Sequence, residues 1–517
     1  MAVIAVALSV AYPFGNDSAA HLYLTSVFAR SGFSLWNNLW YFGRYDFVGY
    51  SYLYYPLASG IGVTAPAVAG LFVFQLIVVG RFFERHLWRR YVIASLLTSP
   101  TVAALILTGA YPFLMSLGLG AIAVLLYLRR SRVGFALFLA LAAATSPLAV
   151  AGVAFVVLWE GLRTWLRSRS SENSPLVGEV IALARSIGGF YLGSFVVVVV
   201  LIAGVEEYFQ IRGSYPYYGT DLAMVLAFSV FLAVASPLLG KRSDTLALLI
   251  ALGAYFAVNV ALFLVPSSVG GNAARVGEVA PSIVAALALR IAPGRLRGWG
   301  KTLLSLGAVG ATLWMSLSVE APVFDPSQGY LTTASNWTPV VAWLRATASQ
   351  RRVEYVDSLL HEGAYYLPEA GIAIARGWFR QDDFPQNALF YQSDLTPGRY
   401  RSWLCANQIA AVVLPPAPYD YSAVAEATLV RSGLPYLSPP RRIGRFAIYR
   451  VLGCSVTTPV RIISPTLALV QIPAGGKYLL PLNYSRLLKV SFGSATSTSA
   501  GRIELTTTRS GVDRLSY

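Results

Sequence analysis

The sequence predicts a polytopic α-helical membrane protein that carries a C-terminal extracytoplasmic α/β domain and a terminal β-rich module. Its 517 residues are 56% hydrophobic and only 12% charged, whereas soluble domains carry about 25% charged residues. The apolar residues recur in blocks close to the roughly 20 residues that a transmembrane helix needs. Beyond residue 320 these blocks stop, and charged residues, prolines and short β-type runs replace them.

The apolar blocks predict about eleven spans. No Lys or Arg precedes the N-terminal apolar run, which argues against a cleaved signal peptide. The block at 133–162 contains Thr145-Ser146-Pro147 and is expected to form two short helices, because proline removes a helical hydrogen bond. The other blocks lie at 55–80, 91–108, 112–128, 187–204, 221–239, 245–264, 279–292 and 302–319.

The basic residues set the expected orientation. The net charge is +16, but the arginines cluster in short loops between apolar blocks. That is the positive-inside pattern, so we expect membrane lipids as partners and no nucleic acid. With eleven spans, all five clusters face the cytoplasm, which puts the N-terminus inside and the C-terminal domain outside a bacterial plasma membrane. The clusters lie at 81–90, 129–132, 163–169, 241–242 and 290–301.

We place three domains along the chain, at 1–319 (membrane), 320–455 (α/β) and 456–517 (β-sandwich-like). In the second domain, β-type runs alternate with helical segments, as in α/β folds. From residue 457 onward the chain is rich in Ser, Thr and Gly, and short strands are expected. The expected strands are 353–360, 371–375, 410–414, 446–451, 467–472, 487–492 and 502–507, with helices at 338–348 and 423–432.

The cysteines and histidines are too few and too scattered for a zinc site. There is no Cys-x-x-Cys, and His21, His86 and His361 are far apart. Cys405 and Cys454 both lie in the C-terminal region. They form a disulfide if that region is extracytoplasmic, and two unpaired thiols are the alternative.

The first outer loop, at 13–56, holds the main catalytic candidates. Asp17 and His21 are four positions apart at the head of an expected helix and so share one face. The Asp17 carboxylate could act as a general base on an acceptor hydroxyl, or hold a divalent cation such as Mg²⁺ or Mn²⁺. The alternative is that Asp17 caps the helix.

A run of Trp and Tyr follows in the same loop, between residues 36 and 55. We interpret it as an interfacial belt, which is common in membrane proteins. The alternative is a shelf that contacts a sugar or prenyl chain, to which Tyr54 and Tyr55 would contribute.

Two later outer loops supply further binding candidates. Arg275 lies on the side where arginine is disfavoured, so it is a candidate ligand for a lipid phosphate together with Glu278. The alternative is an Arg275–Glu278 pair at i,i+3. Glu206 and Glu207 form a second acidic candidate, with solvated loop residues as the alternative.

The α/β domain has its own dense polar stretch, from residue 361 to residue 391. His361, Arg376 and Arg380 within it are candidates to bind a carbohydrate. Ion pairs between the strands of an ordinary α/β fold explain the same residues as an alternative.

Several motifs resemble one family. The stretches GNDSAAHL (15–22), WNNLWYFG (36–43) and YLYYPL (52–57) resemble bacterial membrane proteins called 6-pyruvoyl-tetrahydropterin synthase-related. ARGWFRQD (375–382) and YRSWL (400–404) are similar to actinobacterial members. These proteins in turn resemble GT-C glycosyltransferases, which are multi-spanning enzymes that use polyprenyl-phosphate-linked sugars.

The resemblance implies a GT-C-like fold in which Asp17 matches the acidic residue of the family's first outer loop. A second acidic motif is absent there, and Asp46 is the one candidate for it. The implied activity is inverting transfer of a sugar from a polyprenyl-phosphate donor to a cell-envelope glycan or lipid. A lipid-linked saccharide flippase and a non-catalytic envelope assembly protein are the alternatives.

Overall fold

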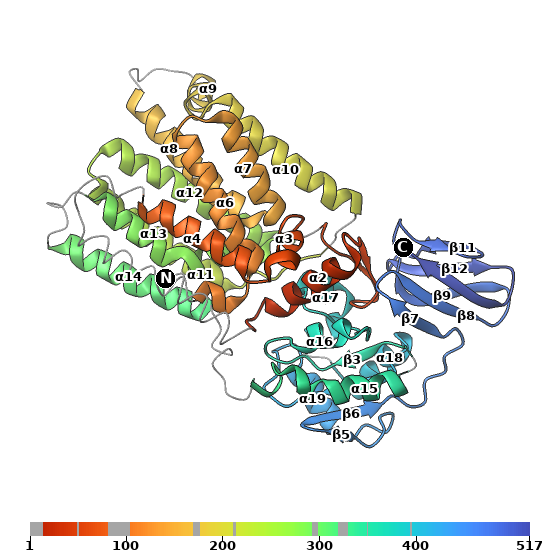
Figure 1. Cartoon of the computed structure of the whole chain (residues 1–517). Helices are drawn as coiled ribbons and strands as arrows, with labels where there is room; N and C mark the ends of the chain where they lie inside the picture. Colours follow the sequence, from red (N-terminus) through yellow and green to blue (C-terminus); the bar gives the residue numbers. More distant parts are fainter. Residues whose placement is uncertain are drawn as a thin grey trace. The chain divides into compact units, whose positions relative to one another are not determined.

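The computed structural model describes residues 14–48, 51–80, 104–168, 176–209, 213–291, 298–318, 329–348, 350–392 and 395–517 (Figure 1). The chain divides into two compact units. A membrane unit comprises Met1–Tyr12 and Tyr50–Ala321, and a second unit comprises Pro13–Gly49 and Pro322–Tyr517. The second unit therefore contains the segment that carries Asp17.

The membrane unit is helical, as predicted. Five of its described helices are long and apolar enough to cross a membrane, or six if the bent pair α3–α4 counts as one span. The predicted total of about eleven spans is not confirmed, and the N-terminal span and the arginine cluster at 81–90 lie outside the described residues. The five are α6 (Tyr111–Leu128), α8 (Leu148–Ser168), α10 (Gly189–Phe209), α11 (Gly219–Ala235) continued by η1 (Ser236–Leu239), and α12 (Arg242–Leu264).

The proline break is confirmed. α7 (Arg132–Thr145) ends directly before Ser146, whose backbone is extended, and α8 begins after Pro147. The helix axis bends by 113° between α3 (Tyr54–Ile61) and α4 (Ala65–Gly80). The remaining helices of this unit are α9 (Leu176–Ile187), η2 (Gly270–Arg275), α13 (Val276–Arg290) and α14 (Trp299–Ser318).

Small residues let two of these helices pack closely. A Cβ atom on Gly118 of α6 would lie 2.3 Å from the carbonyl oxygen of Gly70 in α4. Glycine at both positions therefore brings the two backbones into direct contact, as at many membrane helix interfaces.

The second unit begins its α/β part with a four-stranded sheet in the order β3-β4-β6-β5. Strands β3 (Val353–Tyr355) and β4 (Ala411–Leu414) are parallel, and β6 (Phe446–Arg450) and β5 (Arg441–Ile443) continue the sheet antiparallel. The helical segments are η6 (Ala334–Asn336), α15 (Thr338–Thr347), α16 (Gly363–Glu369), α17 (Arg380–Gln386), η7 (Ala388–Phe390), α18 (Pro397–Ala406) and α19 (Val424–Arg431). The predicted strands at 410–414 and 446–451 and both predicted helices are confirmed. The strand predicted at 353–360 ends at Tyr355, the one at 371–375 forms only an isolated bridge between Val353 and Ile374, and the one at 487–492 is reduced to Lys489–Val490.

The C-terminal residues form two antiparallel sheets, β10-β13-β8-β7 and β11-β12-β9. Buried and more exposed residues alternate along β8 and β12, so each strand turns one face to an apolar core. The strands are β7 (Val460–Ser464), β8 (Leu467–Ile472), β9 (Gly476–Asn483), β10 (Lys489–Val490), β11 (Ser494–Ser497), β12 (Arg502–Thr507) and β13 (Gly511–Ser516). Two of them, β8 and β12, have the predicted bounds.

The N-terminal segment contributes α2 (Ser18–Ser31), β1 (Trp36–Asn37) and β2 (Arg44–Tyr45) to the second unit, where α2 lies beside α16 (Figure 1). Its aromatic rings are core residues. Trp40 and Tyr41 are fully buried, and the Trp40 indole N–H donates to the carbonyl of Ala364 across 3.1 Å. The expectation of an interfacial belt is thus wrong for these rings, because the chain folds back to bury them.

The same segment also contacts the β-rich part. The Asn483 side-chain amide donates to the carbonyls of Tyr41 and Gly43, each across 2.8 Å. The ring of Trp36 stacks on that of Tyr517, with 4.8 Å between centroids. Residues 34–48 therefore join both parts of the second unit.

Cys405 and Cys454 form a disulfide. Of the two alternatives left open by the sequence, a disulfide or two unpaired thiols, the structure has the disulfide. It ties α18 to the chain that leaves β6.

Candidate functional site

Three neighbouring backbone segments run parallel and end at one edge of the sheet. The N–H of Val353 in β3 donates to Ala373, and Ala375 donates back to Val353, each across 2.9 Å. On its other side β3 pairs in parallel with β4. Ligands of open α/β sheets bind beyond the carboxyl ends of parallel strands, so the residues that follow these three segments form the candidate site.

Asp357 and His361 follow β3 and contact each other. The Nδ1 atom of His361 lies 2.6 Å from Oδ2 of Asp357. Burial acts to lower the pKa of His361, but the Asp357 carboxylate outweighs it and raises the pKa above its usual value. The imidazole is therefore held in a charged pair at the sheet edge.

Asp420 follows β4, and its N–H donates to the carbonyl of Asp357 across 3.1 Å. The Arg380 guanidinium, from the third segment, donates to Asp420 Oδ2 across 2.5 Å. Burial alone would raise the pKa of Asp420, yet Arg380 and His361 hold it well below its usual range. Asp420 thus stays ionised between two cationic partners.

Arg376 lies at the centre of a more deeply buried network. Its guanidinium donates to Asp383 across 2.9 Å and to the Ser422 hydroxyl across 2.7 Å. Glu426 lies 3.4 Å and Glu354 3.9 Å from the same guanidinium. Burial, together with the neighbouring carboxylates, raises the pKa of both glutamates. One arginine therefore balances several buried carboxyl groups.

Trp378 connects the sheet edge to the N-terminal segment. Its indole N–H donates to the carbonyl of Asn16 across 2.7 Å. The ring centroids of His21 and His361 each lie 6.4 Å from that of Trp378. The two histidines were both predicted as site candidates, and although they lie 340 positions apart in the sequence, both rings lie near the same indole.

Asp17 stands at the N-terminal end of α2 and is 94% buried. Its side chain makes no capping hydrogen bond to the helix. The local turn is closed by the Ser18 hydroxyl, which accepts from the N–H of Gly15 across 2.7 Å. The capping role offered as an alternative for Asp17 is therefore not observed.

Asp46 is held in an ion pair. It accepts from Arg44 across 2.8 Å and from the Asn37 amide across 2.7 Å. Burial raises the pKa of Asp46 to about 6, against the opposing effect of Arg44. Arg44 also binds Asp382 across 2.7 Å. These contacts fix the β1–β2 hairpin onto α17.

The other predicted site residues belong to the membrane unit. Arg275 lies 3.4 Å from Glu278, so the i,i+3 pair given as an alternative is present. Glu206 and Glu207 lie near the end of α10, where Glu207 is exposed. Tyr54 and Tyr55 are buried at the start of α3. Their roles in binding stay predictions.

No group of three or more His, Cys, Asp or Glu residues arranged to hold a metal ion occurs in the part of the chain that the structure describes. The divalent cation stays a prediction, and no step below passes through one.

Sequence reasoning missed Asp357, Asp420 and Trp378. Asp420 follows a segment predicted as a strand, whereas Asp357 lies within the strand predicted at 353–360, which in the structure ends at Tyr355. Had the parallel pairing of β3 and β4 been recognised, the rule about carboxyl ends would have pointed to both.

Fold and site together define a multi-pass membrane protein whose second unit gathers several acidic residues, two histidines and two arginines. No family model and no curated protein matches the chain. Among solved structures it is similar to the arabinofuranosyltransferase AftD from mycobacteria, at a TM-score of 0.48 and 16% identity over 92% of this chain and 41% of that one. It is also similar to ArnT from Cupriavidus metallidurans bound to undecaprenyl phosphate, at a TM-score of 0.38 and 11% identity over 87% of this chain and 96% of that one.

This chain therefore spans less than half the length of the arabinofuranosyltransferase. With both TM-scores below 0.5, neither likeness assigns a fold or an activity to it.

Proposed function

We propose that the chain is a GT-C-type membrane glycosyltransferase that moves a sugar from a polyprenyl-phosphate donor to a cell-envelope acceptor at the outer face of the membrane. The observation that carries the proposal is the convergence at Trp378. The backbone next to Asp17 and the ring of His21 meet Trp378 there, beside the ring of His361. Arg380 lies on the same sheet edge, where it pairs with Asp420. In the proposal, the carboxylate, the imidazoles and this cation together serve transfer to a hydroxyl group.

The setting supports the same activity. The segment at 14–48 is followed in sequence by apolar helices of the membrane unit. A protein that lies in a membrane shares that membrane with lipid-linked sugars. Disulfides persist in oxidising compartments. The Cys405–Cys454 bond therefore supports an extracytoplasmic second unit. The first-loop resemblance to GT-C-like proteins points the same way.

The proposed reaction is a single displacement. Asp17 takes the proton from an acceptor hydroxyl, and the acceptor oxygen bonds to the anomeric carbon of the donor sugar. The bond from that carbon to the phosphate oxygen breaks, and its electron pair leaves with the polyprenyl phosphate. Attack on one face and departure from the other invert the anomeric configuration.

The remaining residues would bind rather than react. In the proposal, the charged His361–Asp357 pair and Arg380 hold sugar hydroxyl groups, and Trp378 keeps the Asp17 segment in position. Arg275 is the proposed ligand of the departing phosphate, a role in which it would exchange its contact with Glu278 for one with the lipid.

The test is transfer from a panel of labelled polyprenyl-phosphate sugars by purified wild type, Asp17→Asn and a control, Asp244→Asn. Asp244 pairs with Arg167 in the membrane unit. Loss of a general base costs at least about 100-fold in rate. We expect that loss for Asp17→Asn only. Equal turnover by wild type and Asp17→Asn would refute Asp17 as the general base. Binding of the lipid-linked sugar without turnover by any variant would favour a flippase or an envelope assembly protein.

A further inference from the structure

The charged residues of the second unit are divided between its interior and its exterior. No Asp or Glu side chain of this unit is exposed among the residues that the structure describes. The half-buried ones, Glu369, Asp382 and Glu504, each pair with a basic side chain. Exposed Arg and Lys side chains, in contrast, occur on α2, α15, α18 and α19 and on strands of the three larger sheets. The described exterior of the unit is therefore basic.

The β5–β6 hairpin carries the densest group of these basic side chains. Ile443 pairs with Phe446, which leaves a two-residue turn between the strands. The first residue of the turn, Gly444, has a φ of 56°, a backbone conformation that favours glycine. Four side chains of this ten-residue stretch are exposed arginines: Arg441, Arg442, Arg445 and Arg450.

The backbone under these arginines is well anchored. Phe446 and Ile448 of β6 are fully buried. The backbone N–H of Arg445 donates to the Tyr330 hydroxyl across 3.1 Å, and its guanidinium lies 5.0 Å from the centre of the Tyr330 ring. A ligand would therefore meet a hairpin that binding does not have to order.

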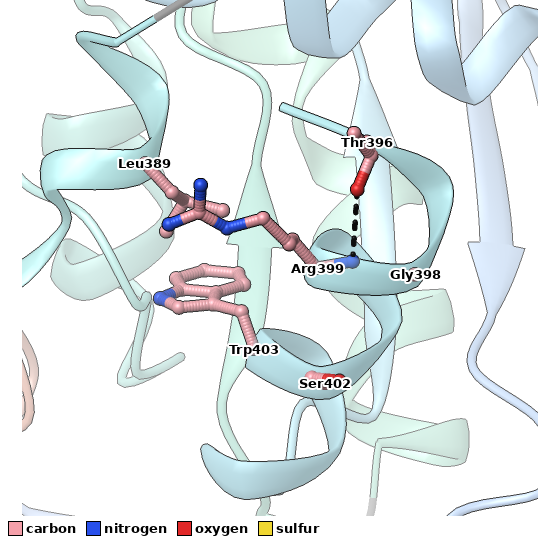
Figure 2. A pocket seen from close by; sticks show the side chains of 6 residues that line it. All are labelled: Leu389, Thr396, Gly398, Arg399, Ser402 and Trp403. Atoms are coloured by element: carbon pink, nitrogen blue, oxygen red, sulfur yellow. Dashed lines mark hydrogen bonds between the residues drawn. The ribbon is translucent and has the colours of Figure 1, made fainter. Parts of the chain in front are cut away.

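The four guanidinium groups are available to a ligand. None of them forms a hydrogen bond or an ion pair with another residue in the described part of the chain. The exposed arginines of α18 differ. Arg401 donates to the carbonyl of Gly453 across 3.5 Å, and Figure 2 shows the Arg399 guanidinium over the ring of Trp403.

Protection of an edge strand does not explain the group. Basic side chains often guard an edge strand such as β5 against pairing with another chain. Arg445, however, lies in the turn, and Arg450 lies in β6, which has a neighbouring strand on each side. These two arginines guard no edge.

The turn of the hairpin lies at the sheet edge that carries the candidate site. Leu414, the last residue of β4, pairs with Ala447, the second residue of β6. The turn before β6 is therefore beyond the carboxyl end of β4, as are the residues of the candidate site. Two strand spacings, or roughly 10 Å, separate β4 from β5. An extended ligand of that length would lie along one edge of the sheet.

We propose that the β5–β6 hairpin binds an anionic glycan of the cell envelope. Guanidinium groups bind carboxylates and phosphates through two parallel hydrogen bonds. A neutral glycan would leave all four cations without a partner charge, and a single small anion would leave most of them so. Envelope polymers are within reach if the second unit is extracytoplasmic, which the Cys405–Cys454 bond supports.

A flexible chain fits the hairpin better than a lipid surface does. Arg441 and Arg442 are successive residues of one strand, so their side chains leave opposite faces of the sheet. A flat bilayer cannot contact both faces, whereas a glycan can wrap around the strand. We assign the bound glycan to the acceptor. That assignment rests on the proposed function, whereas binding of an anionic glycan does not.

The test is binding of fluorescent dextrans to the full chain in nanodiscs of zwitterionic lipid, measured by fluorescence anisotropy. The probes share one length and are carboxylated, phosphorylated or uncharged, and vesicles of anionic lipid serve as competitors. The salt concentration is about 0.1 M, at which exposed charges more than about 10 Å apart are largely screened.

Three variants locate the binding site. The hairpin variant combines Arg441→Gln, Arg442→Gln and Arg445→Gln. A matched control removes the same charge from exposed positions of the β-rich part, through Arg461→Gln, Arg509→Gln and Arg514→Gln. The third variant has lysine at the three hairpin positions and keeps their charge. Thermal unfolding of each variant shows that it is folded.

We expect wild type to bind a charged dextran and to bind the uncharged one at least about tenfold more weakly. The hairpin variant should lose at least about tenfold in affinity, because one basic residue contributes roughly fivefold. The control and the lysine variant should stay close to wild type.

Equal losses in the hairpin variant and the control would overturn the proposal, because net charge alone would then explain binding. Equal binding of charged and uncharged dextran, or displacement of dextran by anionic vesicles at lower charge concentration, would overturn it too. Binding of charged dextran by a chain that transfers no sugar would keep the hairpin site and refute the proposed function.

Discussion

The indole nitrogen of Trp378 donates a hydrogen bond to the backbone carbonyl of Asn16, across 2.7 Å and 362 positions of sequence. This bond fixes the backbone beside Asp17, the proposed base, to the sheet edge that carries His361 and Arg380. The reacting group therefore depends on a segment that is remote in sequence.

Replacement of Gly377 by alanine should loosen that attachment. A Cβ at this position would lie 2.9 Å from the rings of both Trp40 and Tyr41, which are fully buried. Overpacking of this kind costs about 1–3 kcal/mol. Thermal unfolding of purified Gly377→Ala should show the loss, together with faster proteolysis within 13–49. Gly398→Ala is the control, because its Cβ meets open space; equal stability of the two variants would contradict the packing.

Arg376→Met should destabilise the second unit strongly. The substitution leaves Asp383 and Glu426 buried without their cation, and breaking a buried pair costs about 3–5 kcal/mol. The free energy of unfolding in denaturant measures the effect. Arg442→Met removes an exposed arginine of β5 and should change it by less than about 0.5 kcal/mol. A small loss of unfolding free energy in Arg376→Met would show that Asp383 and Glu426 are already neutral in the wild type.

Stability should fall as pH rises, in part because of Glu362. Burial raises the pKa of Glu362 to about 7, although the Ser358 hydroxyl donates to its carboxylate. Between about pH 4.5 and pH 7, Glu362 is protonated in the folded chain but ionised in the unfolded chain. The folded state therefore loses stability as the pH rises through this range. The loss is roughly 3 kcal/mol.

Unfolding measured near pH 5 and near pH 8 checks this sign. Glu362→Gln keeps an acceptor for Ser358 and cannot ionise, so its stability should change less between the two conditions. Glu504→Gln, an exposed position paired with Lys477, should behave as wild type. A pH dependence identical in Glu362→Gln and wild type would remove Glu362 as the cause.

Loss of the Cys405–Cys454 bond should lower stability by about 4 kcal/mol, since the bond closes a loop with a sequence separation of 49. Cys405→Ser, Cys454→Ser and the double variant should lose the same amount, because each removes the same crosslink. Maleimide labelling of denatured wild type should require a reductant first; labelling without one would show that the thiols are not bonded.

The helices of the membrane unit were predictable because apolar block length alone nearly determines them. α8 and its break at Pro147 are examples. The strands β8 and β12 were predictable from alternation of side chains. The count of about eleven spans is not confirmed. Among the described helices, α7 and α13 have 14 and 15 residues, fewer than the roughly 20 that a span needs, and residues 1–13 and 81–103 lie outside the described part of the chain.

Some residues of the candidate site were singled out from the sequence, but their assembly was not. Asp17, His21 and His361 stood out by type and position, yet one sequence carries no signal that 14–48 packs on 350–517. The aromatic run shows why. Trp40 and Tyr41 have the composition of an interfacial belt and of a core alike, and only long-range packing distinguishes the two.

The division of the second unit between two stretches of sequence has a consequence for biosynthesis. Residues 13–49 leave the ribosome first, and roughly 300 residues separate them from the sheet that buries their rings. At about 5–20 residues per second, this interval lasts on the order of 15–60 s. During this interval Trp36, Trp40 and Tyr41 lack the residues that bury their rings in the folded chain. The proposed active site can therefore assemble only after the sheet of the second unit has been synthesised.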